Sequence, residues 1–200
     1  MRINRIHSVV LATLATTLAP ALAIAHDGAS LPYGSFLGGL THPVLGLDHF
    51  LAMVCVGIVS AQIGGKAIWT VPATFVGIMA LGGLLGFMDI GLTAIEAGIA
   101  ASVLVLGGAI ALDKTVPVVF AMCAVAIFAV FHGYAHGAEM PSVANPVTYV
   151  AGFMTGTVLL HVMGVVIGDI SQHYEKGKIV LRLAGGGIAG TGLWFLIGAA

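Results

Sequence analysis

The feature that most constrains this chain is a succession of long apolar segments separated by short polar breaks. The segments lie at about 44–62, 67–87, 92–112, 116–134, 146–168 and 178–198. Each has about 19 to 23 residues, enough for a helix to cross the hydrocarbon core of a bilayer. Lipid offers the backbone no hydrogen-bond partners, so a spanning segment must satisfy its own N–H and C=O groups as a helix. The sequence therefore predicts an all-α polytopic membrane bundle with six transmembrane helices.

The composition agrees with a chain that lies in lipid. Hydrophobic residues make up 59% of the chain and charged residues 8%, and the mean hydropathy is +1.10; these values lie far from those of soluble domains. The 29 glycines suit helices that pack closely inside a membrane, where small residues let backbones approach each other. With a net charge of -1 and scattered cations, nucleic acid is excluded as a partner. Cys55 and Cys123 have no CxxC partner, which argues against a disulfide framework or a zinc knuckle.

Residues 1–25 have the pattern of a cleavable signal peptide. A cationic start at Met1–Arg5 precedes an apolar stretch at 8–18 and the small-residue site Ala23-Ile24-Ala25. These are the three regions of a secretory signal. A retained first helix is the alternative, and it is disfavoured because the apolar run is short and Pro20 interrupts it.

Cleavage after Ala25 would leave one membrane domain at 26–200, with His26 as the mature N-terminal residue. The free amine and the imidazole of His26 can chelate a metal together, although a solvated terminus is the simpler expectation.

The distribution of cations predicts the orientation of the chain in a bacterial inner membrane. The cations that remain after cleavage follow the first, third and fifth segments: Lys66, Lys114, Lys176, Lys178 and Arg182. The connections after the second and fourth segments contain no Lys or Arg. Because cytoplasmic loops carry the excess of positive charge, both mature termini are expected on the periplasmic side.

The first apolar segment begins with a group of polar residues that is unusual for a membrane span. His42 and His49 are seven residues apart, so they would share one face of a continuous helix. Asp48 is the neighbour of His49, and Pro43 suits the first turn of a helix, which would place His42 at the entrance of the span. Ionisable groups in a membrane are costly and commonly mark a site or a pathway.

A second polar group ends the fourth segment. His132 and His136 are four residues apart, and Glu139 follows three residues later, so one helical face would carry all three side chains. Imidazole and carboxylate are ligands that borderline divalent metals accept. A single histidine pair is as often structural as functional. The predicted topology, however, brings both polar groups to the periplasmic face of the inner membrane. We therefore expect His42, Asp48, His49, His132, His136 and Glu139 to form one metal site.

Other polar residues permit alternative interpretations. Glu96 begins the third segment on the outer side, and it either joins the site or is a solvated carboxylate; for Asp89 in the preceding loop, solvation is favoured. His161 lies well inside the fifth segment and is either an inner ligand or an interhelical hydrogen-bond partner. Asp113 lies at a predicted cytoplasmic loop, where it is either a solvated charge or a charge at the exit of a pathway through the membrane.

Two motifs resemble those of the HupE/UreJ family of nickel permeases. The first is His42-Pro43-x-x-Gly46-x-Asp48-His49, and the second is Phe131-His132-Gly133-x-Ala135-His136-Gly137-x-Glu139. Both occur in the order found in the family, and the signal peptide and six spans extend the resemblance over essentially the whole chain. The resemblance implies uptake of nickel, in some relatives cobalt, to supply a metalloenzyme such as hydrogenase or urease. It implies no resident cofactor, since Ni²⁺ would be the transported substrate.

Two other functions compete with transport. A membrane-embedded, metal-dependent hydrolase would use three protein ligands and a metal-bound water, yet no nucleophile motif or Arg accompanies these residues. A haem-binding bundle with paired histidines would need facing ligands and a large apolar pocket. No nucleotide-binding motif indicates ATP hydrolysis. A permease rather than an enzyme is therefore the expected function.

Overall fold

The computed structural model describes residue 31 and residues 33–199; the predicted signal peptide and His26 lie outside the described residues. The described part is helical and contains no strand. Its helices are α2 (Gly34–Leu45), α3 (Leu47–Ile63), α4 (Ala67–Phe87), α5 (Ile95–Leu112), α6 (Val118–Ala138), α7 (Pro146–Gln172) and α8 (Glu175–Gly198). The predicted all-α fold is confirmed.

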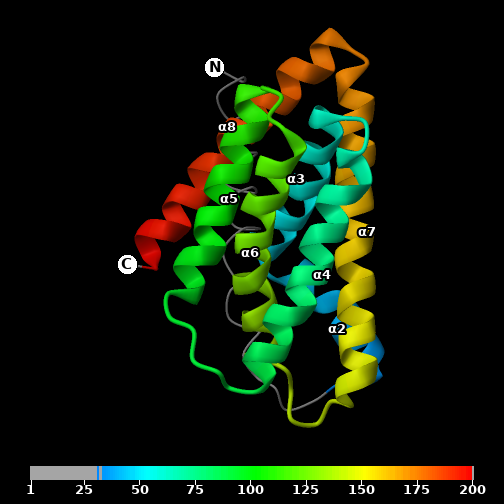
Figure 1. Ribbon diagram of the computed structural model, residues 1–200, viewed down its shortest axis with the longest axis vertical. Coiled ribbons are helices and arrows are strands. Elements are labelled where there is room, and N and C mark those ends of the chain that lie inside the picture. Colours follow the sequence, from blue (N-terminus) through cyan, green and yellow to red (C-terminus); the bar gives the residue numbers. More distant parts are fainter. Residues whose placement is uncertain (1–30, 32, 200) are drawn as a thin grey trace, which may run out of the picture.

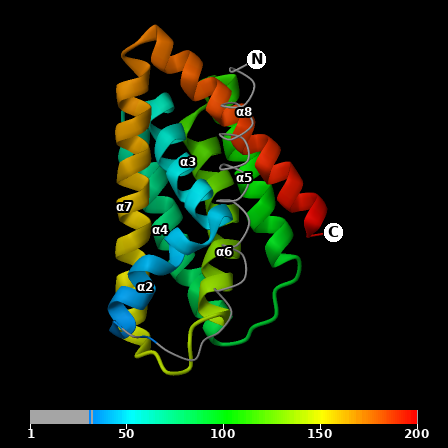
Figure 2. The ribbon, with the colours of Figure 1, turned by 180° about the vertical axis from the view of Figure 1, so that it is seen from behind.

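The helices form a bundle whose connections alternate between two ends. Helices α3 to α7 run along the long axis, while α2 crosses near one end and α8 runs obliquely (Figure 1). The α3–α4, α5–α6 and α7–α8 connections lie at one end, and the α4–α5 and α6–α7 connections lie at the other (Figure 1). From behind, α2 lies beside the beginning of α7 (Figure 2), and these two helices pack together. The five cations after residue 25 therefore gather near the end opposite to α2.

Five of the described helices, α4 to α8, are long and apolar enough to cross a membrane. A sixth span results if α2 and α3 are taken together, although they meet at an angle of 83°. The predicted segment 67–87 coincides with α4, and most other predicted ends differ from the helices by a few residues. The fourth predicted segment stops at 134, whereas α6 continues to Ala138.

The expected continuous helix through His42 and His49 is wrong. The chain breaks at Gly46, whose backbone is extended (φ −87°, ψ 116°). Pro43 consequently lies near the C-terminal end of α2 and not in the first turn of a span. Broken helices at membrane depth are tolerated where they are buried in protein or line a cavity.

Glycine brings the backbones of neighbouring helices into contact. The principal packed pairs are α4 with α6, α5 with α8, and α3 and α2 with α7. Between α3 and α7, a methyl group on Gly57 would collide with the carbonyl oxygen of His161, and one on Gly164 would collide with that of Val54. Contacts of this kind supply dispersion energy in lipid, where no hydrophobic effect drives helices together.

A glycine contact between α4 and α6 fixes the rotation of α6. Gly133 and Gly137 lie against α4, because a methyl group on either would meet the carbonyl oxygens of Met79 and Gly83, respectively. The preceding residue in each case is a histidine, which helix geometry turns by about 100° from that contact. The glycine contacts therefore orient the side chains of His132 and His136 toward the interior of the bundle.

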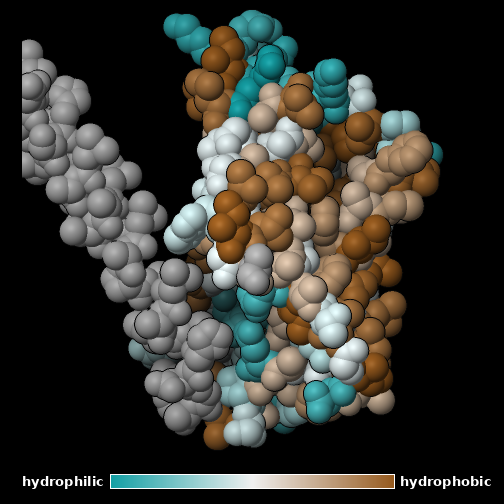
Figure 3. Space-filling view, turned by 90° about the vertical axis from the view of Figure 1, so that its left-hand side faces the viewer, coloured by the Kyte–Doolittle hydropathy of each residue, from teal (hydrophilic) through white to brown (hydrophobic). Residues whose placement is uncertain are grey.

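The outer surface of the bundle is suited to lipid. Large apolar side chains are exposed on several helices, including Trp69 on α4, Phe120 on α6 and Leu183 on α8. Figure 3 shows the side formed by α5 and α8, where hydrophobic residues occupy the middle and hydrophilic residues gather at the upper end and in a strip lower down. A multi-pass membrane protein is the consistent conclusion.

Candidate metal centre

Four imidazole rings meet at the end of the bundle where α2 turns into α3. His136 on α6 lies centrally, with ring centroids 4.8 Å from His42 on α2 and 4.4 Å from His49 on α3. His132, one turn before His136, lies 4.8 Å from His49. These four residues are called the histidine cluster below. The two motifs, about 90 residues apart in the sequence, are therefore in direct contact.

Exposure falls from the outside of the cluster toward its inside. The Glu139 side chain is 37% exposed, that of His42 is 18% exposed and that of His49 is 12% exposed. His136 and His132 are buried. A ligand that enters from this end of the bundle therefore meets a carboxylate before it meets the buried imidazoles.

The neighbouring carboxylate assigns the proton on His49. Asp48 Oδ1 lies 2.8 Å from His49 Nδ1 and also accepts a 2.7 Å hydrogen bond from the His49 backbone N–H. An ionised carboxylate can only accept, so Nδ1 carries the hydrogen and Nε2 keeps its lone pair. His49 Nε2 is buried and has no hydrogen-bond partner within the described residues. Metal-binding histidines commonly have this arrangement, in which a carboxylate orients the ring from the far side.

A hydroxyl group performs the equivalent role for His132. Ser102 Oγ on α5 donates to the carbonyl oxygen of Ile99 at 2.6 Å, so at its 2.9 Å contact with His132 Nε2 it accepts. The hydrogen therefore lies on Nε2, and the lone pair lies on Nδ1. His132 Nδ1 is buried and unpartnered within residues 33–199. His49 and His132 thus each present one unshielded nitrogen lone pair.

His136 is bounded by aromatic rings and imidazoles. Its ring lies 4.1 Å from that of Phe153 on α7, and neither of its buried nitrogens has a hydrogen-bond partner among the described residues. The buried hydroxyl of Tyr149 also has none, and its ring lies 6.1 Å from that of His42. Unpaired buried polar atoms of this kind are costly in a folded protein unless a ligand uses them.

Two carboxylates give the cluster a negative charge. Glu139 directly follows α6 and its Oε2 lies 3.7 Å from His42 Nε2, while Asp48 is bonded to His49. The lysines and Arg182 belong to the connections and helix α8 near the opposite end. The two carboxylates therefore favour a cation over any anion at this end of the bundle.

The cluster as it stands is a set of ring contacts and not a closed coordination sphere. Within residues 33–199, no three His, Cys, Asp or Glu side chains already converge on a common metal position. Ligation at the usual metal–nitrogen distance of about 2.0–2.1 Å would require rotation of these side chains. The arrangement can therefore offer several alternative ligand pairs to an ion that moves among them.

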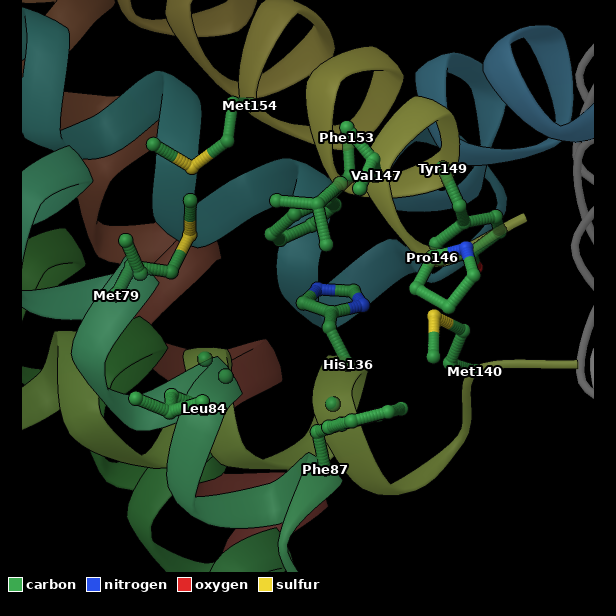
Figure 4. A pocket seen from close by; sticks show the side chains of 15 residues that line it. Met79, Leu84, Phe87, His136, Met140, Pro146, Val147, Tyr149, Phe153 and Met154 are labelled. Atoms are coloured by element: carbon green, nitrogen blue, oxygen red, sulfur yellow. The ribbon is translucent and has the colours of Figure 1, made fainter. Parts of the chain in front are cut away.

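A cavity of about 380 Å³ adjoins the cluster between α4, α6 and α7. The His136 ring lies in its wall, together with the sulfur atoms of Met79, Met140 and Met154 (Figure 4). The Met154 and Met79 side chains lie next to each other in this view, away from Met140. The cavity is otherwise apolar, so imidazole and thioether are the principal donor groups that it offers.

The carboxylates whose roles the sequence did not decide lie at different places in the bundle. Glu96 lines a cavity of about 400 Å³ with Asp48 and the end of α8, so it neighbours the candidate site. Asp89 lies in the α4–α5 connection, beside a separate cavity. Asp113 lies at the opposite end, where its Oδ1 accepts hydrogen bonds from Gln62 at 2.8 Å and Gln172 at 3.1 Å. Asp113 is therefore a link between helices and not a freely solvated charge.

The structure adds residues that sequence analysis did not identify. Ser102, Phe75, Tyr149 and Phe153 all contact histidines of the cluster from other helices. The sequence contained one signal for this set, because Ser102 is a polar residue inside an otherwise apolar span. The aromatic residues have no such signal, since they are common in any membrane helix.

Comparison with known proteins agrees with the two motifs. A family profile described as HupE / UreJ protein matches residues 14–195. Protein HupE of Rhizobium leguminosarum bv. viciae is 45% identical over 193 residues, which cover 96% of this chain and 99% of that protein. No solved structure matches the chain. The chain belongs to the HupE/UreJ family.

Proposed function

We propose that the protein transports a divalent transition-metal ion, most suitably nickel and secondarily cobalt, across the bacterial cytoplasmic membrane. The observation that carries this proposal is the contact among His42, His49, His132 and His136, with Asp48 and Glu139 at its edge. Imidazole and carboxylate suit borderline divalent ions, although the same ligands would favour copper in affinity. The preference for nickel therefore rests on the family resemblance.

In the proposed mechanism, the carboxylates attract the ion and the imidazoles remove part of its hydration shell. Glu139 is the most exposed of these residues and His42 is the most exposed imidazole, so these two act first, and His49 and His136 act next. Asp48 and Ser102 hold the rings of His49 and His132 so that a nitrogen lone pair remains available. Transport requires release as well as capture, and a site with several alternative ligand pairs binds weakly enough for release.

A membrane hydrolase is less consistent with the hydrogen bonding. Ser102 is the hydroxyl in contact with a cluster histidine, and a nucleophilic role would require His132 to accept its hydrogen. The Ser102 hydrogen is directed instead to the Ile99 carbonyl, and His132 Nε2 donates to the serine oxygen. This arrangement orients the imidazole and does not activate the hydroxyl.

Metal accumulation in cells that express the protein tests the proposal. Nickel, cobalt, zinc and copper should be compared side by side, with nickel accumulation expected to rise most. His136→Ala should reduce nickel accumulation to the background of cells that lack the protein. His173→Ala is the matched control, because His173 is exposed beyond the far end of α7 and its Nδ1 donates to the Asp169 carbonyl oxygen at 2.7 Å. Unchanged nickel accumulation in His136→Ala at equal membrane levels would refute the proposed site.

A further inference from the structure

A fifth buried histidine lies deeper in the bundle than the histidine cluster. His161 on α7 is 2% exposed, and neither of its ring nitrogens has a hydrogen-bond partner within the described residues. An interhelical hydrogen bond therefore does not account for its presence in the membrane. Burial of an unpaired imidazole is unfavourable, and a leucine of similar size would avoid the cost.

His161 is connected to the cluster through one aromatic ring. The Phe75 ring on α4 lies 5.6 Å from that of His132 and 5.2 Å from that of His161. The α6 histidine and the α7 histidine therefore contact the same side chain. Phe75 therefore links the cluster to the next imidazole through direct ring contacts on both sides.

A hydroxyl that lies one helical turn from His161 on α7 contacts a thioether on α4. Met79 is one turn after Phe75 on α4, and Thr157 is one turn before His161 on α7; the Met79 sulfur lies 3.9 Å from Thr157 Oγ1. Both residues are fully buried. Met79 also lines the cavity into which His136 projects (Figure 4). The donor groups therefore continue from the cluster to His161 without leaving the protein interior.

We propose that His161 and Met79 form a second, inner binding position for the transported divalent ion, with Thr157 beside it. This proposal rests on the transport function proposed above. One imidazole, one thioether and one hydroxyl are fewer donors than those of the cluster, and none of the three carries a negative charge. The inner position therefore binds a partly dehydrated ion weakly, as a transit position requires.

Equilibrium binding of Ni²⁺ to the purified full chain in detergent tests the inner position. The wild-type protein should bind two ions per chain, and His161→Leu, which keeps the volume and removes both nitrogens, should bind one. Nickel uptake by His161→Leu should fall at least tenfold at equal membrane levels. His173→Leu is the control and should bind two ions and transport normally.

X-ray absorption of the bound nickel supplies a measurement that a merely structural role would not change. A sulfur scatterer should appear with the second equivalent of nickel and should disappear in Met79→Leu. Met79→Leu conserves the approximate size of the side chain. It therefore also tests the inner position if His161→Leu does not fold.

The inner position is refuted if His161→Leu binds two ions and transports at the wild-type rate while His136→Ala abolishes uptake. In that case the transport function stands. If the wild-type protein itself neither binds nor accumulates metal, the transport function fails, and the inner position fails with it.

Discussion

At the scale of single residues, the orientation of two histidines in the candidate site depends on the groups that hydrogen-bond to them. Asp48 and Ser102 each accept a hydrogen from one nitrogen of a histidine and so leave the other nitrogen with its lone pair. Partners of this kind fix the tautomer and the ring orientation, and their loss commonly costs about 10- to 100-fold in metal affinity. The identity of residues outside the two motifs therefore bears on transport.

Ser102→Ala should raise the nickel concentration needed for half-maximal uptake by about tenfold, because His132 loses the acceptor that holds its ring. Concentration-dependent uptake at equal membrane levels measures this. Ser60→Ala is the matched control, since Ser60 is also buried and donates to the carbonyl of the residue three positions earlier at 2.7 Å. Ser60 contacts no histidine of the cluster in the hydrogen bonds described. Equal effects of the two substitutions would contradict the orienting role of Ser102.

At the scale of helices, close backbone contacts determine which side chains face the interior. Gly133 and Gly137 place α6 against α4, and the break at Gly46 allows α2 and α3 to approach α6 from two directions. A methyl group on Gly46 would lie 3.0 Å from Asp48 Oδ1 and 3.3 Å from His49 Nδ1. The glycines of both motifs therefore have a steric function beside the candidate ligands.

Gly133→Ala should destabilise the protein, because its methyl group meets the backbone carbonyl of Met79, which cannot move without α4. The expected loss in the free energy of unfolding is about 1–3 kcal/mol. Thermal unfolding of the purified protein in detergent would show a lower midpoint. Gly77→Ala, at a position with open space within 4 Å, should leave the midpoint unchanged or raise it. A Gly133→Ala midpoint equal to that of the wild type would show that α4 and α6 are not held this closely.

The helices were largely predictable from hydropathy. The break between α2 and α3 and the C-terminal end of α6 were not. The predicted span at 67–87 coincides with α4, because an uninterrupted apolar segment gives a sharp hydropathy signal. The predicted end at 134 falls short of Ala138 because His136 lowers the hydropathy of the last turn. A single glycine inside a helical pattern does not mark a break, so the 83° bend at Gly46 had no signal. Contact between the two motifs was predicted from the topology, whereas the continuous helix assumed for His42 and His49 was wrong.

At the scale of the whole molecule, the charged residues divide the bundle into two unlike ends. The histidine cluster and its carboxylates lie at one end. The connections that carry Lys66 and Lys114, and the start of α8 with Lys176, lie at the other (Figure 1). From the positive-inside rule we expect the cluster on the periplasmic side. This orientation agrees with uptake, since capture of the ion would precede its passage inward.

Reporter fusions test this orientation. A reporter that is active only in the cytoplasm should work after Lys66, Lys114 or Lys178, and one that is active only in the periplasm should work after Asp89 or Pro141. The physical reason is the cost of moving cationic loops across the membrane. Periplasmic activity of a fusion after Lys178 would place the histidine cluster on the wrong side for uptake.

The central claim is that the two motifs form one site for one ion. Nickel uptake should therefore be measured for His42→Ala, His132→Ala and the double variant at equal membrane levels, with His173→Ala as the control. Each single variant should lose most of its uptake, and the double variant should be little worse than either, because residues that act as one unit are not additive. Near-wild-type uptake in both single variants would contradict the claim, and so would two partial losses that multiply in the double variant.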